Sequence, residues 1–280
     1  MDALMRGPYE AMVRAVLASL ERNLLPDLLL RRLTRLLLAS RLRLGYQPSA
    51  ELQLSHLLQF ARSLEQMPIA VETDKPKSQH YELPTSFFKL VLGENLKYRD
   101  LQLLNVKIIV SDISKFKMEA SFDRIISIEM FEHMKNYKEL LKKISMWMKE
   151  DSLLFVHYFC HKAFAYHFED TNEDDWITRY FFTGGTMPSA NLLLYFQDDV
   201  TVVNHWLVNG THYAQTSEEW LKRMDQNSAS IRPIMESTYG KDAATKWTAY
   251  WRTFFIAVAE LFGYNNGEEW MVAHFLFKMK

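Results

Sequence analysis

Three residues that could move a proton lie within five positions of one another. In the run Glu129-Met130-Phe131-Glu132-His133, two carboxylates and an imidazole follow the β-branched stretch 124–128 (RIISI). A carboxylate can orient a neighbouring imidazole for proton transfer, which suits general acid–base chemistry. The same residue types also suit the solvated first turn of a helix, where the helix dipole favours acids. Spacing alone leaves both interpretations open.

Two further clusters contain residues that could carry chemistry. His157, Cys160, His161 and His167 form the pattern H-x2-C-H-x5-H. Zinc sites of this kind usually have paired, closely spaced ligands on two arms, whereas one cysteine stands alone here, so we predict no metal site. Residues 183–186 (TGGT) lack the lysine and the following helix of a phosphate-binding loop, so they predict a tight turn.

The elements around residues 129–133 follow a strand–helix–strand pattern. We expect strands at 106–110 (VKIIV), 124–128 and 153–159 (LLFVHYF), and a helix at 137–149 with one apolar face. The last two strands and their helix form a β-α-β unit, in which the strands should be parallel with a right-handed crossover. The pattern predicts an α/β fold.

Ligands of open α/β sheets bind outside the carboxyl ends of the strands. This rule nominates Asp112, Glu129 and the residues around Tyr158. A nucleotide-binding loop normally also needs glycines clustered after a strand. None of the nine glycines lies between Gly93 and Gly184, although this interval holds the strand–helix–strand pattern.

The flanking segments have different compositions. Residues 10–44 predict two amphipathic helices separated at Pro26-Asp27. With eight arginines and four acids in residues 1–44, a transit peptide or membrane-surface helix is an alternative, but the acids favour a helical domain with a solvated basic face. Residues 68–79 predict a linker, because they are polar and contain two prolines.

The region from Phe155 onward holds 26 of the 38 aromatic residues. Such density is typical of a core, and it also suits a pocket for a flat or lipid-like substrate. We expect Asn209-Gly210 to turn between two strands and Thr216 with Glu219 to form a capping box. Residues 242–262 predict a long helix that ends at Gly263, and 271–278 predict a final strand.

Composition excludes several classes of function. A formal net charge of −1 gives no electrostatic reason to expect a nucleic-acid partner. A single cysteine excludes an internal disulfide framework and fits a reducing compartment. Because no apolar stretch approaches the ~20 residues that span a bilayer, we predict a cytoplasmic protein without a membrane span.

Five long segments resemble the plant coclaurine N-methyltransferase-like proteins, a family related to the cyclopropane-fatty-acid synthases. The resemblance covers nearly the whole chain. The segments are QHYELPTSFFKLVLGENLKY (79–98), FDRIISIEMFEHMKNY (122–137), DWITRYFFTGGTMPS (175–189), HWLVNGTHYAQTSEEWL (205–221) and YWRTFFIAVAELFGYNNGEEW (250–270).

This resemblance implies a Rossmann-like methyltransferase fold with an N-terminal helical region. It also implies S-adenosylmethionine (S-adenosyl-L-methionine) as cofactor and N-methylation of a small tetrahydroisoquinoline-like amine in alkaloid biosynthesis. By matching motifs, the family's catalytic residues fall on Glu129, Glu132 and His133. Its substrate-binding residues fall on Tyr250, Trp251 and Phe254, and its cofactor-binding residues on Tyr81, Tyr98, Asp112 and Ile113.

One departure from the family is large. Lys97-Tyr98 runs directly into Arg99, where the family instead has the glycine-rich loop and its flanking strands. At least ~50 residues are absent by ordinary element lengths, so we expect a sheet truncated in its first half and impaired cofactor binding. The expected organisation is a helical region at 1–67, a linker with the HY and KY motifs at 68–98, and a partial methyltransferase core with an aromatic insert at 99–280.

Three functions are therefore compatible with the sequence. The first is N-methylation of a small-molecule amine, and the second is lipid modification of the cyclopropane type. The closer match in the aromatic tail argues against the lipid substrate. The third is a non-catalytic form that is unstable or pairs with an intact subunit, and a homodimer is compatible with all three.

Overall fold

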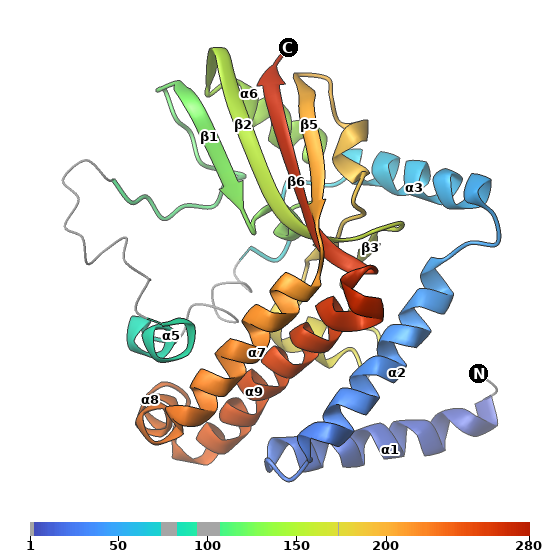
Figure 1. Cartoon of the computed structure of the whole chain (residues 1–280), viewed down its shortest axis with the longest axis vertical. Helices are drawn as coiled ribbons and strands as arrows, with labels where there is room; N and C mark the ends of the chain where they lie inside the picture. Colours follow the sequence, from blue (N-terminus) through green and yellow to red (C-terminus); the bar gives the residue numbers. More distant parts are fainter. Residues whose placement is uncertain (1–2, 74–82, 94–106, 173) are drawn as a thin grey trace.

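A four-stranded sheet and a bundle of helices share the chain between them (Figure 1). The computed structural model describes residues 3–73, 83–93, 107–172 and 174–280. The sheet occupies the upper half of Figure 1 and the helical bundle the lower half. Among the described residues, no helix combines the length and apolar character needed to cross a bilayer.

The sheet has the order β1-β2-β6-β5. β1 (Phe122–Ile128) and β2 (Met148–His161) are parallel and joined by α6 (Tyr137–Ser145), which confirms the predicted parallel pair and its connecting helix. β6 (Trp270–Met279) runs antiparallel to β2 and to β5 (Val200–Val208). The chain therefore ends inside the sheet, between two strands that precede it in sequence.

Three helices form the N-terminal region: α1 (Ala3–Glu21), α2 (Asp27–Gly45) and α3 (Ala50–Glu65). The predicted break between the first two is confirmed, because the carbonyl of Pro26 accepts the amides that begin α2. α2 lies against α9, where Arg31 Nη1 is 2.9 Å from the buried carboxylate of Glu260.

The C-terminal bundle contains α7 (Thr211–Gln226), α8 (Ser228–Tyr239) and α9 (Lys241–Gly263), with α5 (Thr85–Leu92) packed on α7 and α8. α9 confirms the predicted long helix ending at Gly263. Short elements join bundle and sheet; they are η1 (Phe131–His133), β3 (Tyr166–His167), the π-helix η2 (Thr178–Phe182), β4 (Thr186–Met187), η3 (Leu192–Tyr195) and η4 (Tyr264–Gly267).

Separate hydrophobic cores support the two halves. α6 and α3 cover one face of the sheet, where Leu140, Val156 and Phe275 are fully buried. Aromatic side chains dominate the core of the bundle, including Trp251 and Phe87. Aromatic residues on the surface of the bundle would be exposed to solvent. Most of the C-terminal aromatic residues therefore belong to the core.

Three local predictions are wrong. Thr216 lies inside α7 and donates to the carbonyl of His212, so it does not cap a helix. Asn209-Gly210 joins β5 to α7 instead of joining two strands, because the N–H of Thr211 bonds to the Asn209 side chain. The helix predicted at 137–149 ends at Ser145, since the chain is already extended in β2 from Met148.

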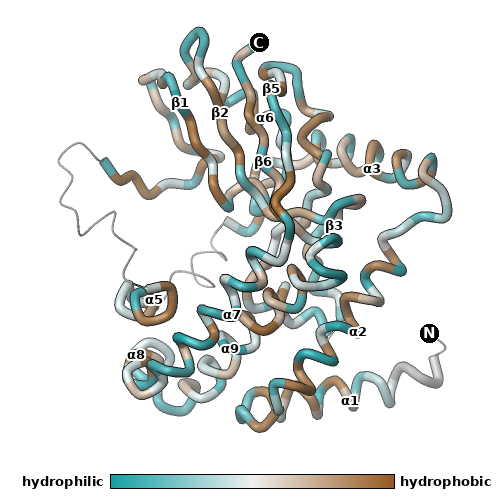
Figure 2. The backbone as a smooth tube through the Cα atoms, viewed as in Figure 1, coloured by the Kyte–Doolittle hydropathy of each residue, from teal (hydrophilic) through white to brown (hydrophobic). Residues whose placement is uncertain are grey.

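The strand predicted at 106–110 is also wrong for the four residues that the structure describes. Residues 107–110 form no strand, and the side chain of Val110 is 93% exposed. A β-branched run forms a strand only beside a partner strand, and β1 pairs only with β2 among the described residues. The run after the grey trace in Figure 2 is brown (hydrophobic) and yet lies away from the sheet.

β1 forms an open edge of the sheet in the described chain. Ile126 and Ile128 are 66% and 61% exposed, although both are aliphatic strand residues. Their neighbours across the sheet, Phe155 and His157 of β2, are half-buried on the same face. This is the exposed edge expected from the missing segment, and it leaves one face of β1 in contact with solvent.

The open edge predicts unequal effects of two matched substitutions. Ile126→Ala should lower the free energy of unfolding by about 1 kcal/mol or less, because little apolar area is lost. Ile144→Ala on α6 removes a side chain that is 3% exposed, so it should cost about 2–5 kcal/mol. Urea unfolding followed by tryptophan fluorescence measures both. Equal costs would show that a further layer covers β1 in solution.

Candidate functional site

The segment 129–133 begins at the carboxyl end of β1. The amide of Glu129 still donates to the carbonyl of His157, so the β1–β2 ladder continues to this residue. Glu129 then adopts φ of 51°, a left-handed conformation that is uncommon for residues other than glycine. The chain consequently leaves the sheet at once and continues into the single turn η1, which holds Glu132 and His133.

The carboxylate of Glu129 contacts two other elements. One oxygen, Oε1, is 2.9 Å from Nε2 of His157 on β2, and the other, Oε2, accepts a hydrogen bond of 3.2 Å from the Tyr213 hydroxyl of α7. Burial, followed by the nearby Glu129 charge, raises the pKa of Tyr213 well above its usual value. Tyr213 therefore stays a donor, and Glu129 is fixed between sheet and bundle.

His157 extends this chain of polar contacts across the sheet. Its Nδ1 lies 2.9 Å from Nε2 of His274 on β6. Burial and the adjacent His157 lower the pKa of His274. The polar row from Tyr213 through Glu129 and His157 to His274 thus joins α7 to three neighbouring elements of the sheet.

Glu132 is the most unusual group of the segment. Its side chain is 1% exposed, and neither carboxyl oxygen has a well-formed hydrogen bond among the described residues. Burial raises the pKa of Glu132 well above its usual value, and the charge of Glu129 raises it further. Burial therefore favours the protonated form of this carboxyl, and the interpretation of Glu132 as part of a solvated helical turn is wrong.

His133 faces the aromatic part of the molecule. Its half-buried imidazole lies nearly parallel to the ring of Phe182, with the ring centroids 6.3 Å apart. The ring of Phe182 is in turn 6.0 Å from Phe254 of α9, and Phe181 stacks on Phe254 at 4.6 Å. The end of η2 therefore links segment 129–133 to the predicted substrate residues.

The three predicted substrate residues differ in their surroundings. Trp251 is buried against Phe181, and its indole N–H has no hydrogen-bond partner among the described residues. Phe254 is half-buried. Tyr250 packs instead on Tyr180, and its hydroxyl donates to Glu21 of α1 at 2.7 Å. Tyr250 therefore holds α1 to the bundle, while Trp251 and Phe254 face η2.

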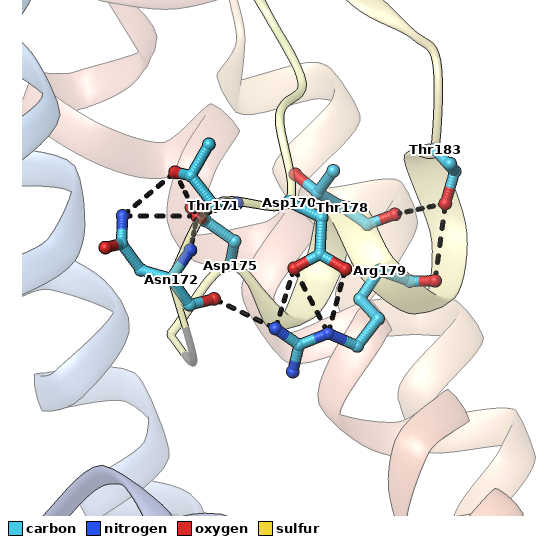
Figure 3. Close-up of polar contacts among 7 residues, drawn as sticks. All are labelled: Asp170, Thr171, Asn172, Asp175, Thr178, Arg179 and Thr183. Carbon is cyan, nitrogen blue, oxygen red and sulfur yellow. Dashed lines mark hydrogen bonds and ion pairs between the residues drawn. The ribbon is translucent and has the colours of Figure 1, made fainter. Parts of the chain in front are cut away.

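A group of hydrogen bonds around Arg179 fixes η2 and so positions its phenylalanines (Figure 3). The guanidinium of Arg179 binds both carboxylate oxygens of Asp170, at 2.7 and 3.0 Å, and donates to the carbonyl of Asn172. The hydroxyl of Thr183 bonds back to the carbonyl of Arg179. These contacts attach Asp170 and Asn172 to η2 and the following Thr183.

The four predicted cofactor residues are only partly described. Tyr81 and Tyr98 lie outside the described residues. Asp112 and Ile113 form a turn that is tied to α6, because Lys143 donates to the carbonyl of Ser114. The contacts of this turn run to α6, whereas those of residues 129–133 run to β2, α7 and η2.

One carboxylate oxygen of Asp112, Oδ2, lies 3.8 Å from the ammonium of Lys115 and could also accept from a polar ligand. Its Oδ1 accepts from the amide and hydroxyl of Ser114, which lowers the pKa of the carboxyl. Its buried Oδ2 makes no hydrogen bond among the described residues. These features are compatible with a hydroxyl or amine of a bound nucleoside.

Sequence reasoning missed several residues of the site. Tyr213 lies in the segment 205–221, and His157 lies next to Tyr158, but no spacing rule pairs either one with Glu129. The histidines of the H-x2-C-H-x5-H pattern separate: His161 lies beside Glu269 and His167 beside Lys135. The described residues contain no group of three or more His, Cys, Asp or Glu side chains able to hold a metal ion.

Comparisons with known proteins agree with this geometry. The family "Mycolic acid cyclopropane synthetase" matches residues 99–265. (S)-Coclaurine N-methyltransferases of Thalictrum flavum subsp. glaucum and Papaver somniferum are each 38% identical, covering 98% and 95% of this chain and 98% of each relative. A crystal structure of coclaurine N-methyltransferase bound to N-methylheliamine and SAH matches with a TM-score of 0.91 at 37% identity, covering 95% of this chain and 99% of that chain.

The fold and these matches define a Rossmann-like methyltransferase. Members of this class bind S-adenosylmethionine. The chain belongs to the coclaurine N-methyltransferase family.

The alignment with a relative is longer than this chain. The match to the Thalictrum relative extends over 353 positions, which exceeds the 280 residues of this chain by 73. At least that many positions of the relative therefore face a gap in this chain, more than the ~50 residues expected from element lengths.

The buried Glu132 predicts a pH-dependent effect on stability. An acid with a raised folded-state pKa contributes fully below its unfolded pKa, and that stability is lost as the pH rises toward the folded value. Glu132→Gln cannot ionise, so its unfolding free energy should gain on the parent by up to about 1.4 kcal/mol per pH unit between pH 5 and pH 8. Urea unfolding at both pH values measures the difference.

Glu150→Gln is the matched control for this experiment, because Glu150 is exposed on β2. Its unfolding free energy should follow that of the parent at both pH values. A Glu132→Gln difference that stays constant with pH would show that Glu132 is ionised in the folded protein.

Proposed function

We propose that this chain is an S-adenosylmethionine-dependent N-methyltransferase for a small tetrahydroisoquinoline-like amine. The observation that carries the proposal is the buried, neutral Glu132 between Glu129 and His133, next to an aromatic wall. Such a site combines proton-transfer groups with a surface for a flat ring. The relatives named coclaurine N-methyltransferase support the amine as substrate.

The residues of segment 129–133 handle the proton that methylation releases. When bound, the cofactor would supply a sulfonium methyl group, whose S–C bond would break, with the thioether as leaving group, as the lone pair of the amine forms the new C–N bond. Only the neutral amine has a free lone pair, so an amine bound in its ammonium form must first lose a proton. His133 takes this proton, Glu129 orients the ammonium form of the substrate, and Glu132 donates a hydrogen bond as a neutral acid.

Trp251 and Phe254, with Tyr250 behind them, hold the substrate ring. Phe181 and Phe182 lie between His133 and α9, so a ring bound there lies next to the imidazole. Stacking and cation–π contact stabilise a cationic amine in such surroundings. The free indole N–H of Trp251 provides a donor for an oxygen substituent.

Cofactor binding by this chain is weakened. Asp112 and Ile113, with Tyr81 and Tyr98, would hold the nucleoside, and Oδ2 of Asp112, which makes no hydrogen bond among the described residues, fits this role. The alignment gap supports the loss of the backbone donors that a glycine-rich loop provides. The single cysteine, Cys160, which is buried, supports a reducing compartment such as the cytoplasm.

A non-catalytic form is the second candidate. It is favoured by the alignment gap together with the open edge of β1, which leaves apolar side chains in solvent. Such a chain could act by pairing with an intact subunit.

The affinity for the cofactor shows whether this chain is impaired or is an ordinary enzyme of the family. We expect calorimetric titration with S-adenosylmethionine to give a Kd weaker than about 100 μM, because side chains cannot replace the missing backbone donors. A control titration with an intact family member should give much tighter binding. A micromolar Kd for this chain would remove the proposed impairment and leave the plain enzyme.

Substitutions test the assignment of roles at saturating cofactor. His133→Ala should lower kcat by about 10²-fold or more, the usual scale of acid–base assistance. Trp251→Ala should act mainly on KM for the amine, because stacking is present in ground and transition states alike. His56→Ala, on the exposed face of α3, is the control. An unchanged kcat for His133→Ala removes the imidazole from the mechanism, and absence of turnover in the parent chain selects the second candidate.

A further inference from the structure

A buried lysine lies two residues beyond His133. Lys135 is 3% exposed and occupies the loop between η1 and α6. Its ammonium makes three contacts, at 2.8 Å to Nδ1 of His167, 2.8 Å to the carbonyl of Gly185 and 2.9 Å to the hydroxyl of Thr186. All three donors of the ammonium are therefore used inside the protein.

The partners of Lys135 belong to one small ribbon. β3 and β4 pair His167 with Thr186, and Gly185 precedes β4 directly. The carbonyl of Gly185 also accepts from the amide of Phe168, which ties together the two strands of the ribbon. Lys135 thus binds the loop after η1 to both strands of the β3–β4 ribbon.

The ribbon supports the acid–base segment directly. A side chain added at Gly185 would place its Cβ 3.5 Å from the carbonyl oxygen of Glu132 and 3.0 Å from the ring of Phe168. On the opposite side, the amide of Lys135 donates to the carbonyl of Ile69 at 2.8 Å. The loop that carries Glu132 is therefore held between the ribbon and residues 68–70.

We propose that Lys135 is a positioning residue whose ammonium fixes Glu132 and His133 relative to the aromatic wall by binding the β3–β4 ribbon. The catalytic part of this inference rests on the proposed function; the structural part does not. Lys135 acts through the backbone of segment 131–134, since its own ammonium is directed at the ribbon.

The charges around Lys135 make this contact sensitive to pH. Burial lowers the pKa of Lys135 to about 8, and the carboxylate of Glu169 opposes this shift. Burial, followed by the charge of Lys135, lowers the pKa of His167 to about 4, so the imidazole is neutral and its Nδ1 accepts. Burial raises the pKa of Glu132, the remaining acid of the segment, well above its usual value. Above about pH 8 the lysine loses a donor and one acceptor of the ribbon loses its partner.

Hydrogen exchange tests the structural part without any activity. The amides of His133 and Met134 donate to the carbonyls of Met130 and Phe131, both at 3.0 Å, and so report on the turn. In Lys135→Met these two amides should exchange about tenfold faster or more, while the amide of Leu154 in β2 stays unchanged. Lys138→Met removes an exposed lysine of α6 and should change none of them.

A conservative variant and a pH series of the parent chain complete the hydrogen-exchange test. Lys135→Arg retains the charge and should restore most of the protection. The parent chain should lose protection at His133 and Met134 between pH 7 and pH 9, after correction for intrinsic exchange; this series suffices if Lys135→Met does not fold. Unchanged exchange in the variant or in the pH series overturns the proposal. Equal acceleration at Leu154 also overturns it, because Lys135 would then only stabilise the whole fold.

Kinetics test the catalytic part. Lys135→Met should lower kcat about tenfold or more and leave KM for the amine within about threefold, because misplacement of a proton acceptor affects the transition state most. Lys135→Arg should recover part of kcat. A change in KM alone contradicts the positioning role, whereas absence of turnover in the parent chain contradicts the proposed function and leaves the exchange result standing.

Discussion

Burial of the Glu132 carboxyl beside the carboxylate of Glu129 is the constraint around which the site is arranged. A low dielectric constant and the neighbouring carboxylate both disfavour a charge on Glu132, so its pKa is raised well above the usual value. The carboxylate of Glu129 contacts α7 through the Tyr213 hydroxyl and β2 through the imidazole of His157. Sheet and bundle are consequently joined at the candidate site.

The helical bundle and the sheet differ in how fully their apolar side chains are buried. The bundle has a continuous aromatic core, and ion pairs such as Arg31 with Glu260 attach the N-terminal helices to it. The sheet, by contrast, is covered on one face by α6 and α3 and ends at the exposed strand β1. The alignment with the Thalictrum relative runs over more positions than this chain has residues, so some residues of that relative have no counterpart here.

Sequence patterns predicted much of the fold where local spacing decides structure. The break at Pro26, the parallel pair β1 and β2 and the helix ending at Gly263 were all predictable, because turn residues and hydrophobic periods act within a few positions. Residues 107–110 have the same β-branched character as β1 but form no strand. Strand formation needs a partner, and the local pattern carries no information about whether that partner is present.

The sequence by itself determined that two acids and a histidine follow a strand and that aromatic residues concentrate near the carboxyl end. Only the tertiary structure determined how deeply these residues are buried and which groups they contact. The raised pKa of Glu132 results from burial, and the orientation of Glu129 results from Tyr213, which lies 84 positions away. Lys135 likewise finds its acceptors at positions 167, 185 and 186. Protonation and hydrogen bonding depend on distances in space, which the spacing of residues along the chain does not specify.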